Sequence, residues 1–307
     1  MPNLTVLVPL DGSKAAEQAL LYLRALSPLS NLRIRLLGVV ESDGSVSGAE
    51  ETAREHLVAD YLEGVDRRLQ GEFDRPIECV RRTGKPFVEI LEEAADPTVN
   101  FILMTTHGRT SGKDDRLGSV ADKVVRGATC PTLLVGPHAS VPLVMEQITV
   151  ALDGSALAAE ALPVARALAE RLNSRLRLVR AVEHPLSLES DTVGSLATDL
   201  VESLDLTASL YLSEAKLEME TRQPVETAVL SGPPAEALMM DVKQNPPSIL
   251  IMTSHGHTGF IKWALGSVTD RLIRGPVPVL VLRPEHEVGN RMKPLASEPN
   301  QTSSSQR

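Results

Sequence analysis

Two Asp-Gly-Ser tripeptides, at residues 11–13 and 153–155, each follow a short apolar run, VLVPL and ITVAL. If these runs are strands, Asp11 and Asp153 stand at their carboxyl ends, where open α/β sheets bind ligands. A carboxylate there can accept a hydrogen bond from a ribose hydroxyl or an exocyclic amine. The alternative is that Asp and Ser only cap the following helix. The residues alone leave both interpretations open.

A second pattern combines glycines with the start of a helix. Gly108 and Gly256 follow apolar runs that end in Thr-His and Ser-His, and nine residues separate each of them from a Gly-Ser pair, at 118–119 and 266–267. Glycine lets the backbone come close to a ligand, and a helix N-terminus presents unpaired N–H groups to an anion. The spacing predicts a phosphate-binding loop. The alternative is a glycine turn followed by serine N-caps.

Two common phosphate signatures are missing. No two glycines are separated by a single residue, which excludes the dinucleotide fingerprint G-x-G-x-x-G, and Gly112-Lys113 is followed by Asp114 rather than by the Ser or Thr of a P-loop. His107 and His255 are more typical of hydrogen-bonded turns than of general bases, because no motif places a nucleophile or a carboxylate beside them. These absences exclude the commonest NAD-binding and P-loop functions.

The loop of the first copy also carries basic residues. Arg109, Lys113 and Arg116 could pair with phosphate, although a solvated charged loop is the preferred interpretation. The sequence contains no cluster of metal-ligating residues, so any bound cation, such as Mg²⁺, would arrive with a nucleotide.

These patterns belong to three sequence blocks that recur in the same order. The blocks begin at Val6, Thr83 and Met104 in the first copy and at Ile148, Ser231 and Met252 in the second. Apolar β-branched runs predict strands near 4–9, 33–40, 76–82, 99–105 and 131–136, and near 147–152, 175–182, 224–230, 248–253 and 277–282. Amphipathic stretches predict helices near 14–27, 49–71, 86–95 and 118–127, and near 156–173, 195–220, 234–243 and 266–274.

Strands that alternate with helices indicate right-handed βαβ units and parallel sheets covered on both faces. We therefore predict an α/β protein made of two tandem, doubly wound domains, each with a five-stranded parallel sheet. The predicted domains are residues 1–137 and 147–284, joined by a linker at 138–146 that contains Pro142. The polar segment 285–307 predicts a disordered tail.

Composition narrows the range of partners and locations. The formal net charge is −9, which argues against nucleic acid and anionic membranes as partners because both attract clustered Lys and Arg. The sequence shows neither a long apolar run nor a secretory signal, so we expect a cytoplasmic protein. The two cysteines, Cys79 and Cys130, adjoin apolar runs and predict small buried hydrophobes rather than a disulfide.

The opening strand with its Asp-Gly-Ser and the spacing G-x2-G-x9-G-[ST] resemble those of universal stress protein domains, which have an adenine nucleotide α-hydrolase-like fold. The resemblance covers nearly all of both copies and implies a tandem universal stress protein. It also implies that the two aspartates contact a nucleoside, that the glycines and serines hold phosphates, and that second-strand backbone and a methionine meet the base. The implied nucleotide-binding residues are Asp153, Val182, Met252, Gly256, Gly266, Ser267 and Val268 in the second copy, and Pro9, Asp11, Val40 (or its neighbour Val39), Met104, Gly108, Gly118, Ser119 and Val120 in the first.

The sequence departs from the family pattern in two ways. Thr105 and Thr253 stand where the motif has its first glycine, and the first copy has GKDDRL before Gly-Ser where the second has GFIKWAL. The carboxylates of that first loop would lie near a bound phosphate. We therefore expect the second copy to be the better nucleotide site.

The resemblance implies a stress-response protein that binds ATP, or a related adenine nucleotide, as a regulatory or conformational ligand. One alternative is an enzyme that slowly hydrolyses ATP or transfers its phosphate, with His255 and Lys262 as its candidate residues. Another is an interaction protein without nucleotide. The resemblance also implies that the fifth strands, near 132–135 and 279–282, pair within the chain. Both a monomer and a homodimer of the whole chain are compatible with this pairing.

Overall fold

The computed structural model describes residues 3–42, 48–73, 76–109, 117–184, 191–254 and 265–283, and for 191–197 it describes the backbone alone. In the first copy the elements are β1 (Leu4–Leu10), α1 (Gln18–Ala25), β2 (Leu32–Glu41), α2 (Gly48–Gln70), β3 (Ile77–Gly84), α3 (Pro86–Ala95), β4 (Val99–Thr105), α4 (Ser119–Gly127) and β5 (Thr132–Val135). In the second copy they are β6 (Gln147–Ala151), α5 (Ala156–Ala159), α6 (Ala161–Leu172), β7 (Arg175–Val182), α7 (Asp191–Glu218), β8 (Val225–Ser231), α8 (Pro234–Gln244), β9 (Ile249–Thr253), α9 (Ser267–Leu272) and β10 (Val279–Leu282).

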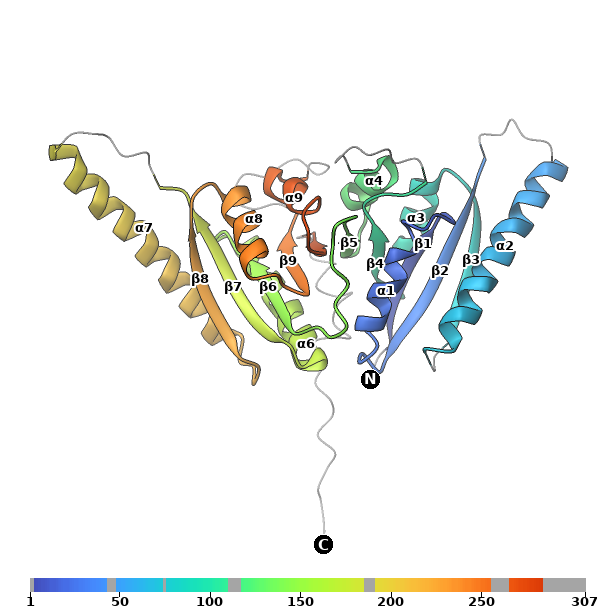
Figure 1. The fold of residues 1–307 in the computed structure, drawn as a ribbon, viewed down its shortest axis with the longest axis horizontal. Helices are drawn as coiled ribbons and strands as arrows, with labels where there is room; N and C mark the ends of the chain where they lie inside the picture. The colour runs from blue at the N-terminus through green and yellow to red at the C-terminus, as the bar shows by residue number, and fades with distance from the viewer. Residues whose placement is uncertain are drawn as a thin grey trace, which may run out of the picture.

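The strands form one 10-stranded sheet in the order β3-β2-β1-β4-β5-β10-β9-β6-β7-β8. Within each copy neighbouring strands are parallel, and the same internal order occurs on both sides of the centre. The two halves meet where β5 and β10 pair antiparallel, with Leu133 opposite Leu280 (Figure 1). The predicted fold class and the intrachain pairing of the fifth strands are both confirmed.

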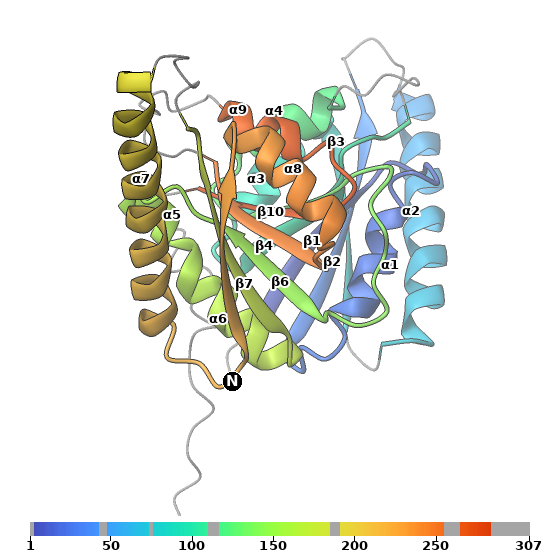
Figure 2. The ribbon, with the colours of Figure 1, turned by 60° about the vertical axis from the view of Figure 1, so that its left-hand side comes forward.

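Helices cover both faces of the sheet (Figure 2). Buried side chains of α1, α2, α6 and α7 pack on one face, and those of α3, α4, α8 and α9 pack on the other. Each of these two apolar cores runs through both copies without a break. Because apolar burial is the main stabilising term in folding, the two copies stabilise each other.

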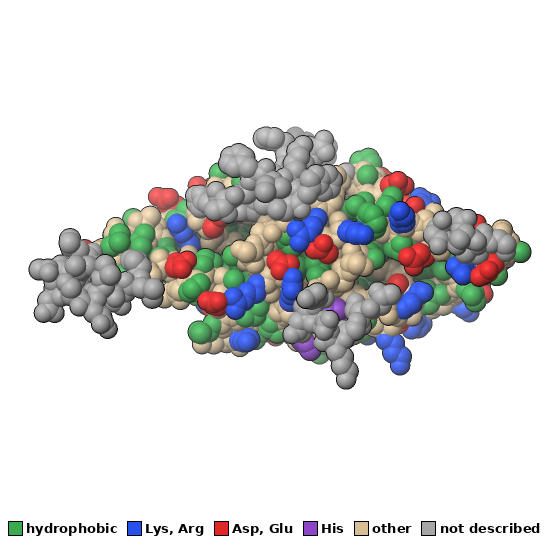
Figure 3. Space-filling model, turned by 90° about the horizontal axis from the view of Figure 1, so that it is seen from above, with side chains coloured by type: hydrophobic (Ala, Val, Ile, Leu, Met, Phe, Trp, Pro, Cys, Tyr) green, Lys and Arg blue, Asp and Glu red, His purple; other side chains and the backbone are tan. Residues whose placement is uncertain are grey.

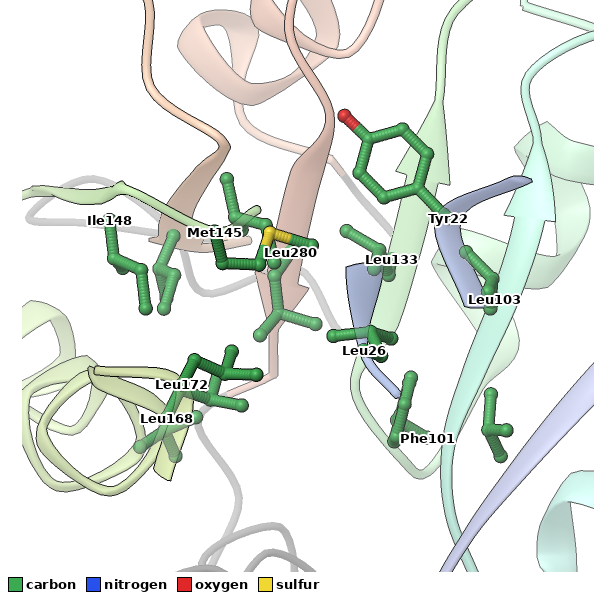
Figure 4. Packing of buried hydrophobic residues seen from close by; sticks show 14 of the residues in the cluster. Tyr22, Leu26, Phe101, Leu103, Leu133, Met145, Ile148, Leu168, Leu172 and Leu280 are labelled. Carbon is green, nitrogen blue, oxygen red and sulfur yellow. The ribbon is translucent and has the colours of Figure 1, made fainter. Parts of the chain in front are cut away.

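Tyr22 of α1 anchors the junction between the copies. Its ring is fully buried, and its hydroxyl donates a 2.8 Å hydrogen bond to the carbonyl of Ser140 in the connecting segment. Leu133, Met145 and Leu280, which come from both halves, belong to the same apolar core at this junction (Figure 4). The junction is therefore an aliphatic core with one hydrogen-bonded aromatic side chain.

One predicted helix is divided in two. The pattern predicts a continuous helix near 156–173, whereas the structure has α5 ending at Ala159 and α6 beginning at Ala161. Pro163 lacks the N–H that would bond the carbonyl of Ala159, and its ring would clash with that carbonyl in a continuous helix. Along the part of the chain that is described, none of the helices has the length and apolarity needed to cross a membrane.

Candidate functional site

A cavity of about 600 Å³ opens in the first copy at the carboxyl ends of β1, β2 and β4. The chain leaves β1 toward β2 on one side and the sheet continues through β4 on the other, so this is the point where strand order reverses and where such folds bind ligands. Its lining comes from these strand ends, the loop after β4, and the first turns of α3 and α4. A volume of this size is typical of small-molecule sites.

The Asp-Gly-Ser turns share the same backbone conformation and the same backbone hydrogen bond in the two copies. Gly12 and Gly154 have φ angles of +82° and +89°, which only glycine adopts readily. The Ser13 N–H donates a 2.9 Å hydrogen bond to Oδ1 of Asp11, and Ser155 bonds Asp153 at the same distance. Each aspartate thus closes a turn with one oxygen.

The serines of these turns cap the chain that follows. Oγ of Ser13 accepts the N–H of Ala16 at 3.1 Å, and Oγ of Ser155 accepts that of Ala158 at 3.1 Å. The capping role that the sequence offered as an alternative therefore belongs to serine, and the second oxygen of Asp11 bonds another part of the chain.

In the first copy that second oxygen is taken by the loop after β4. The backbone N–H of Arg109 donates a 2.6 Å hydrogen bond to Oδ2 of Asp11, and its guanidinium donates to the Asp11 carbonyl. A Cβ at Gly108 would lie only 2.6 Å from the same oxygen. Glycine is needed at 108 because the carboxylate occupies the space, whether or not a ligand is bound.

These contacts set the charge state of Asp11. Burial raises the pKa of Asp11, but hydrogen bonds from Ser13 and Arg109, together with the Arg109 charge, outweigh it and leave the pKa below its ordinary value. The group is therefore a carboxylate at neutral pH, suited to accept hydrogen bonds and poorly suited to take up a proton.

The two ends of the predicted phosphate loop are joined in both copies. The Gly118 N–H donates to the Thr106 carbonyl at 2.8 Å, and the Gly266 N–H donates to the Ser254 carbonyl at 2.9 Å. The N-caps are Gly118 and Gly266, and neither cap makes a side-chain hydrogen bond. Serine N-caps are thus ruled out, and Ser119 instead lines the cavity at the first turn of α4.

Thr105, which replaces the first motif glycine, braces the loop. Its hydroxyl donates a 2.6 Å hydrogen bond to the His107 carbonyl, and the Thr106 hydroxyl lies 2.8 Å from Nδ1 of His107. Both threonines are buried. His107 is therefore held as a hydrogen-bonded turn residue, and the threonine substitution supplies a side-chain bond that glycine lacks.

The structure brings most of the residues predicted for the first site into one cavity. Its lining includes Pro9, Asp11, Met104, Gly108, Gly118, Ser119 and Val120. Val40 is different: its buried side chain lines an adjoining cleft of about 450 Å³ between β2 and α2, and Val39 lines the cavity itself. Successive strand residues point to opposite faces, so only one of the two valine side chains can face α3 and α4.

One wall of the cavity was not predicted. Lys85 and Phe87 from the start of α3, and Lys123 from α4, line it opposite the strand ends, and Nζ of Lys123 lies 4.3 Å from the centre of the Phe87 ring. The second copy has Pro233, Ala235 and Arg271 at the matching positions. The recurring block that begins at Thr83 was the signal for this wall, because it places a helix start at the same sheet edge.

In the second copy, the topology carries Asp153, Val182, Met252 and the Gly266–Ser267–Val268 helix start to the corresponding sheet edge. Gly256 and the rest of segment 255–264 lie outside the described residues. The expectation that this copy is the better nucleotide site therefore stays a prediction. The candidate roles of His255 and Lys262 also stay predictions. In the first copy, Lys113, Asp114 and Arg116 lie outside the described residues.

The copies differ in the guanidinium that covers the Asp-Gly turn. In the first copy the Nη2 of Arg109 lies 3.9 Å from the position of a Cβ at Gly12. In the second, Arg180 of β7 places its guanidinium carbon 2.8 Å from a Cβ at Gly154 and 5.2 Å from the centre of the Tyr211 ring. Both turns are covered by a cation, but it comes from the predicted phosphate loop in one copy and from the sheet in the other.

Charges of both signs border the site. Lys85, Arg109 and Lys123 line the cavity together with Asp11 and Glu41, and seen onto this edge the described surface intermixes basic and acidic side chains (Figure 3). Among the residues whose placement is described, no three His, Cys, Asp or Glu side chains gather as a metal site would require. The cavity thus combines apolar lining residues with a rim that carries charges of both signs.

Comparisons with known proteins agree with the repeat. The universal stress protein family model matches residues 3–136 and again residues 145–283. Universal stress protein Rv2005c of Mycobacterium tuberculosis is 26% identical over 310 residues, covering 91% of this chain and 96% of that protein. Universal stress protein MJ0577 of Methanocaldococcus jannaschii is 26% identical over 151 residues, covering 42% of this chain and 93% of its own.

Among solved structures, the crystal structure of a universal stress protein from Archaeoglobus fulgidus superposes with a TM-score of 0.69 at 21% identity, covering 92% of this chain and 97% of that one. This likeness supports the fold of the whole chain, with both copies included.

Proposed function

The chain belongs to the universal stress protein family, and on that basis we propose that it binds ATP or a related adenine nucleotide as a conformational ligand. The observation that carries the proposal is the cavity of the first copy, in which the Asp11 carboxylate and the N-terminus of α4 line one space. A carboxylate suits the hydroxyl and amino groups of a nucleoside, and a helix N-terminus suits phosphate.

The lining fits the parts of a nucleotide. Leu37, Val39 and Met104 supply apolar surface for a base. The first N–H groups of α4 and the ammonium of Lys123 supply donors and positive charge for phosphates. Mg²⁺ would enter the cavity together with the nucleotide, bound to its phosphates, and their negative charge would balance that of the ion.

Asp11 keeps capacity for a ligand although Ser13 and Arg109 already bond it. Each of those residues gives one backbone N–H to a different carboxylate oxygen. A carboxylate has about four lone-pair sites, so a ribose hydroxyl can be added without breaking either bond. The existing bonds then hold the carboxylate in place, which favours binding because its conformation is fixed beforehand.

The same residues argue for slow or absent hydrolysis. The pKa of Asp11 is lowered, and a carboxylate that holds its charge so firmly is a weak general base. His107 is engaged by Thr106 within its turn. Binding that shifts conformation or partner choice, in a cytoplasmic stress response, is therefore the function we propose.

Nucleotide released from the denatured, purified protein should be identified by chromatography and counted per chain. Ser119→Glu and Ser267→Glu are the matched variants, since an acidic residue in the first turn favours the helix but repels phosphate. We expect adenine nucleotide in the wild type and its loss from the first copy in Ser119→Glu. The response to Ser267→Glu reports the second site.

Titration calorimetry with ATP, with and without Mg²⁺, completes the test. Absence of released nucleotide together with absence of ATP binding would overturn the proposal and favour an interaction protein. Steady turnover of ATP at enzymatic rates would instead favour the phosphate-cleaving alternative.

A further inference from the structure

The outer face of α7 carries an exposed apolar stripe. Leu206, Leu210 and Leu217 are 60%, 55% and 78% exposed, and Ser213 is exposed between them. The intervals of four, three and four residues place these side chains in line along the helix. This is the spacing of the seam between two helices of a coiled coil.

The stripe is not needed to attach α7 to its own domain. Ala208, Leu212, Ala215 and Met219 have the same spacing on the opposite side of the helix, and all are at most 3% exposed. Leu212, Ala215 and Met219 pack in the core against the sheet. The helix therefore has two apolar faces, of which the fold uses only one.

The first copy shows that the fold does not require an apolar outer face. Tyr61-Leu62 of α2 matches Tyr211-Leu212 of α7, which aligns the two helices. At the positions that match the stripe, α2 has exposed His56, Asp60, Glu63 and Arg67. The same architecture thus carries a charged outer face in one copy and leucines in the other.

We propose that the α7 stripe is a self-association surface, and that a second copy of this chain covers it with its own α7 in antiparallel orientation. A two-fold axis between residues 211 and 212 sets Leu206 against Leu217 of the other copy and Leu210 against its Ser213. The same patch then serves on both subunits, as closed dimers require.

Charge favours the antiparallel orientation. Asp199 continues the stripe at its N-terminal end. In a parallel pair it would face Asp199 of the second chain across the seam, and the two carboxylates would repel each other. In the antiparallel pair the flanking residues meet as Thr207 with Glu214 and as Ser209 with Lys216, so like charges do not oppose each other. Helix dipoles also favour antiparallel neighbours.

The position of α7 leaves room for a second copy. It lies at the end of the molecule farthest from α2, with the β5–β10 junction between them (Figure 1). Dimerisation through α7 therefore leaves the intrachain pairing intact. Because the seam is short, it falls with the small interfaces below about 1,200 Å², which associate reversibly.

Sedimentation velocity of the full chain from about 1 to 200 μM, a range that spans micromolar dissociation constants, tests the proposal. We expect the wild type to shift from monomer to dimer across this range. Leu210→Asp with Leu217→Arg, which installs the α2 residues, should remain monomeric throughout. Asp60→Ala with Arg67→Ala changes the same face of α2 and should dimerise like the wild type.

Circular dichroism and thermal unfolding of each variant establish that all are folded, since the exchanged side chains are exposed. A wild type that stays monomeric at every concentration, or a double leucine variant that dimerises as the wild type does, overturns the proposal. Orientation is tested in a Cys79→Ala background: Leu206→Cys mixed with tagged Leu217→Cys should form a mixed disulfide. Disulfide formation by Leu206→Cys alone contradicts the antiparallel pair.

Discussion

The backbone N–H of Arg109 donates a 2.6 Å hydrogen bond to Oδ2 of Asp11, which joins the loop after β4 to the end of β1. The two strands are neighbours in the sheet, so this bond links two adjacent strand ends through the rim of the cavity. Gly108 makes the approach possible because a Cβ there would lie 2.6 Å from the carboxylate oxygen.

Gly108→Ala should therefore displace the Asp11 carboxylate. We expect a loss of about 1–2 kcal/mol in the free energy of unfolding and roughly tenfold weaker ATP binding, the equivalent of about one hydrogen bond. Urea denaturation and titration calorimetry measure the two effects.

Gly64→Ala is the control for this substitution. Gly64 lies inside α2, and a Cβ there would meet nothing within 4 Å. Its replacement should stabilise the protein by about 0.5–1 kcal/mol through helix propensity and leave ATP binding unchanged. Equal effects of the two substitutions would contradict the role assigned to Gly108.

The two Asp-Gly turns should respond differently to the same substitution. Gly12→Ala and Gly154→Ala both place a Cβ at positive φ, which costs about 1–2 kcal/mol. Gly154→Ala also meets the Arg180 guanidinium at 2.8 Å and should lose about 1 kcal/mol more.

A double-mutant cycle checks this difference. In an Arg180→Ala background the additional cost at Gly154 should vanish, because the crowded guanidinium is gone. Additive effects of Gly154→Ala and Arg180→Ala on unfolding would show that the two residues do not interact.

The fold could be predicted from the sequence because apolar residues with the spacing of strands alternate with apolar residues with the spacing of helices through both repeats. Pairing of β5 with β10 was expected from the family resemblance, and it buries Leu133 and Leu280. The break between α5 and α6 was missed because Pro163 is only the eighth residue of a pattern, 156–173, that otherwise continues. A proline within an apolar-periodic stretch is a stronger stop signal than the periodicity around it.

The site was predicted only in part. Motif spacing located the strand ends and the start of α4, because those features are local in the sequence. The recurring block at Thr83 marks the start of α3, but the wall made by Lys85, Phe87 and Lys123 also depends on α3 packing beside α4, and local spacing does not encode that contact. Likewise, the bond between Arg109 and Asp11 could not be inferred, since it depends on loop conformation.

Asp96, at the end of α3, should make stability depend on pH. Hydrogen bonds from Arg35 and Thr98 lower the pKa of Asp96 to about 2, and the Arg35 contact is 2.8 Å long. A lowered pKa in the folded state stabilises the protein above the unfolded value near 4, and this stabilisation is lost as pH falls toward 2.

The carboxylate is 35% exposed, so screening reduces its contribution to about 1 kcal/mol. Asp96→Asn should lower the free energy of unfolding by that amount at pH 7 and by much less at pH 2.5, as urea denaturation at the two pH values can measure. Asp60→Asn, on the exposed face of α2, should change neither value. A cost of Asp96→Asn that is independent of pH would exclude the ionic contribution.

Arg283 joins the second copy to the helix that borders the cavity of the first. Following β10, its guanidinium donates to the carbonyls of Arg126 and Ala128 at the C-terminal end of α4. A cation at this end is favourable to the helix dipole. Gly136 stands at the matching position after β5, and a Cβ there would lie 3.0 Å from the carbonyl oxygen of Gly275. The C-terminal end of α9 therefore meets only the backbone of Gly136.

Arg283→Ala should therefore cost about 1–2 kcal/mol, the value of charged hydrogen bonds to carbonyl groups, and should increase amide hydrogen exchange in α4 more than in α9. Arg271→Ala removes an exposed pair with Glu236 and should cost less than about 0.5 kcal/mol. If exchange in α4 and α9 rises equally, Arg283 acts through global stability. A rise confined to α4 shows that the second copy holds in place the helix whose first turn lines the cavity of the first.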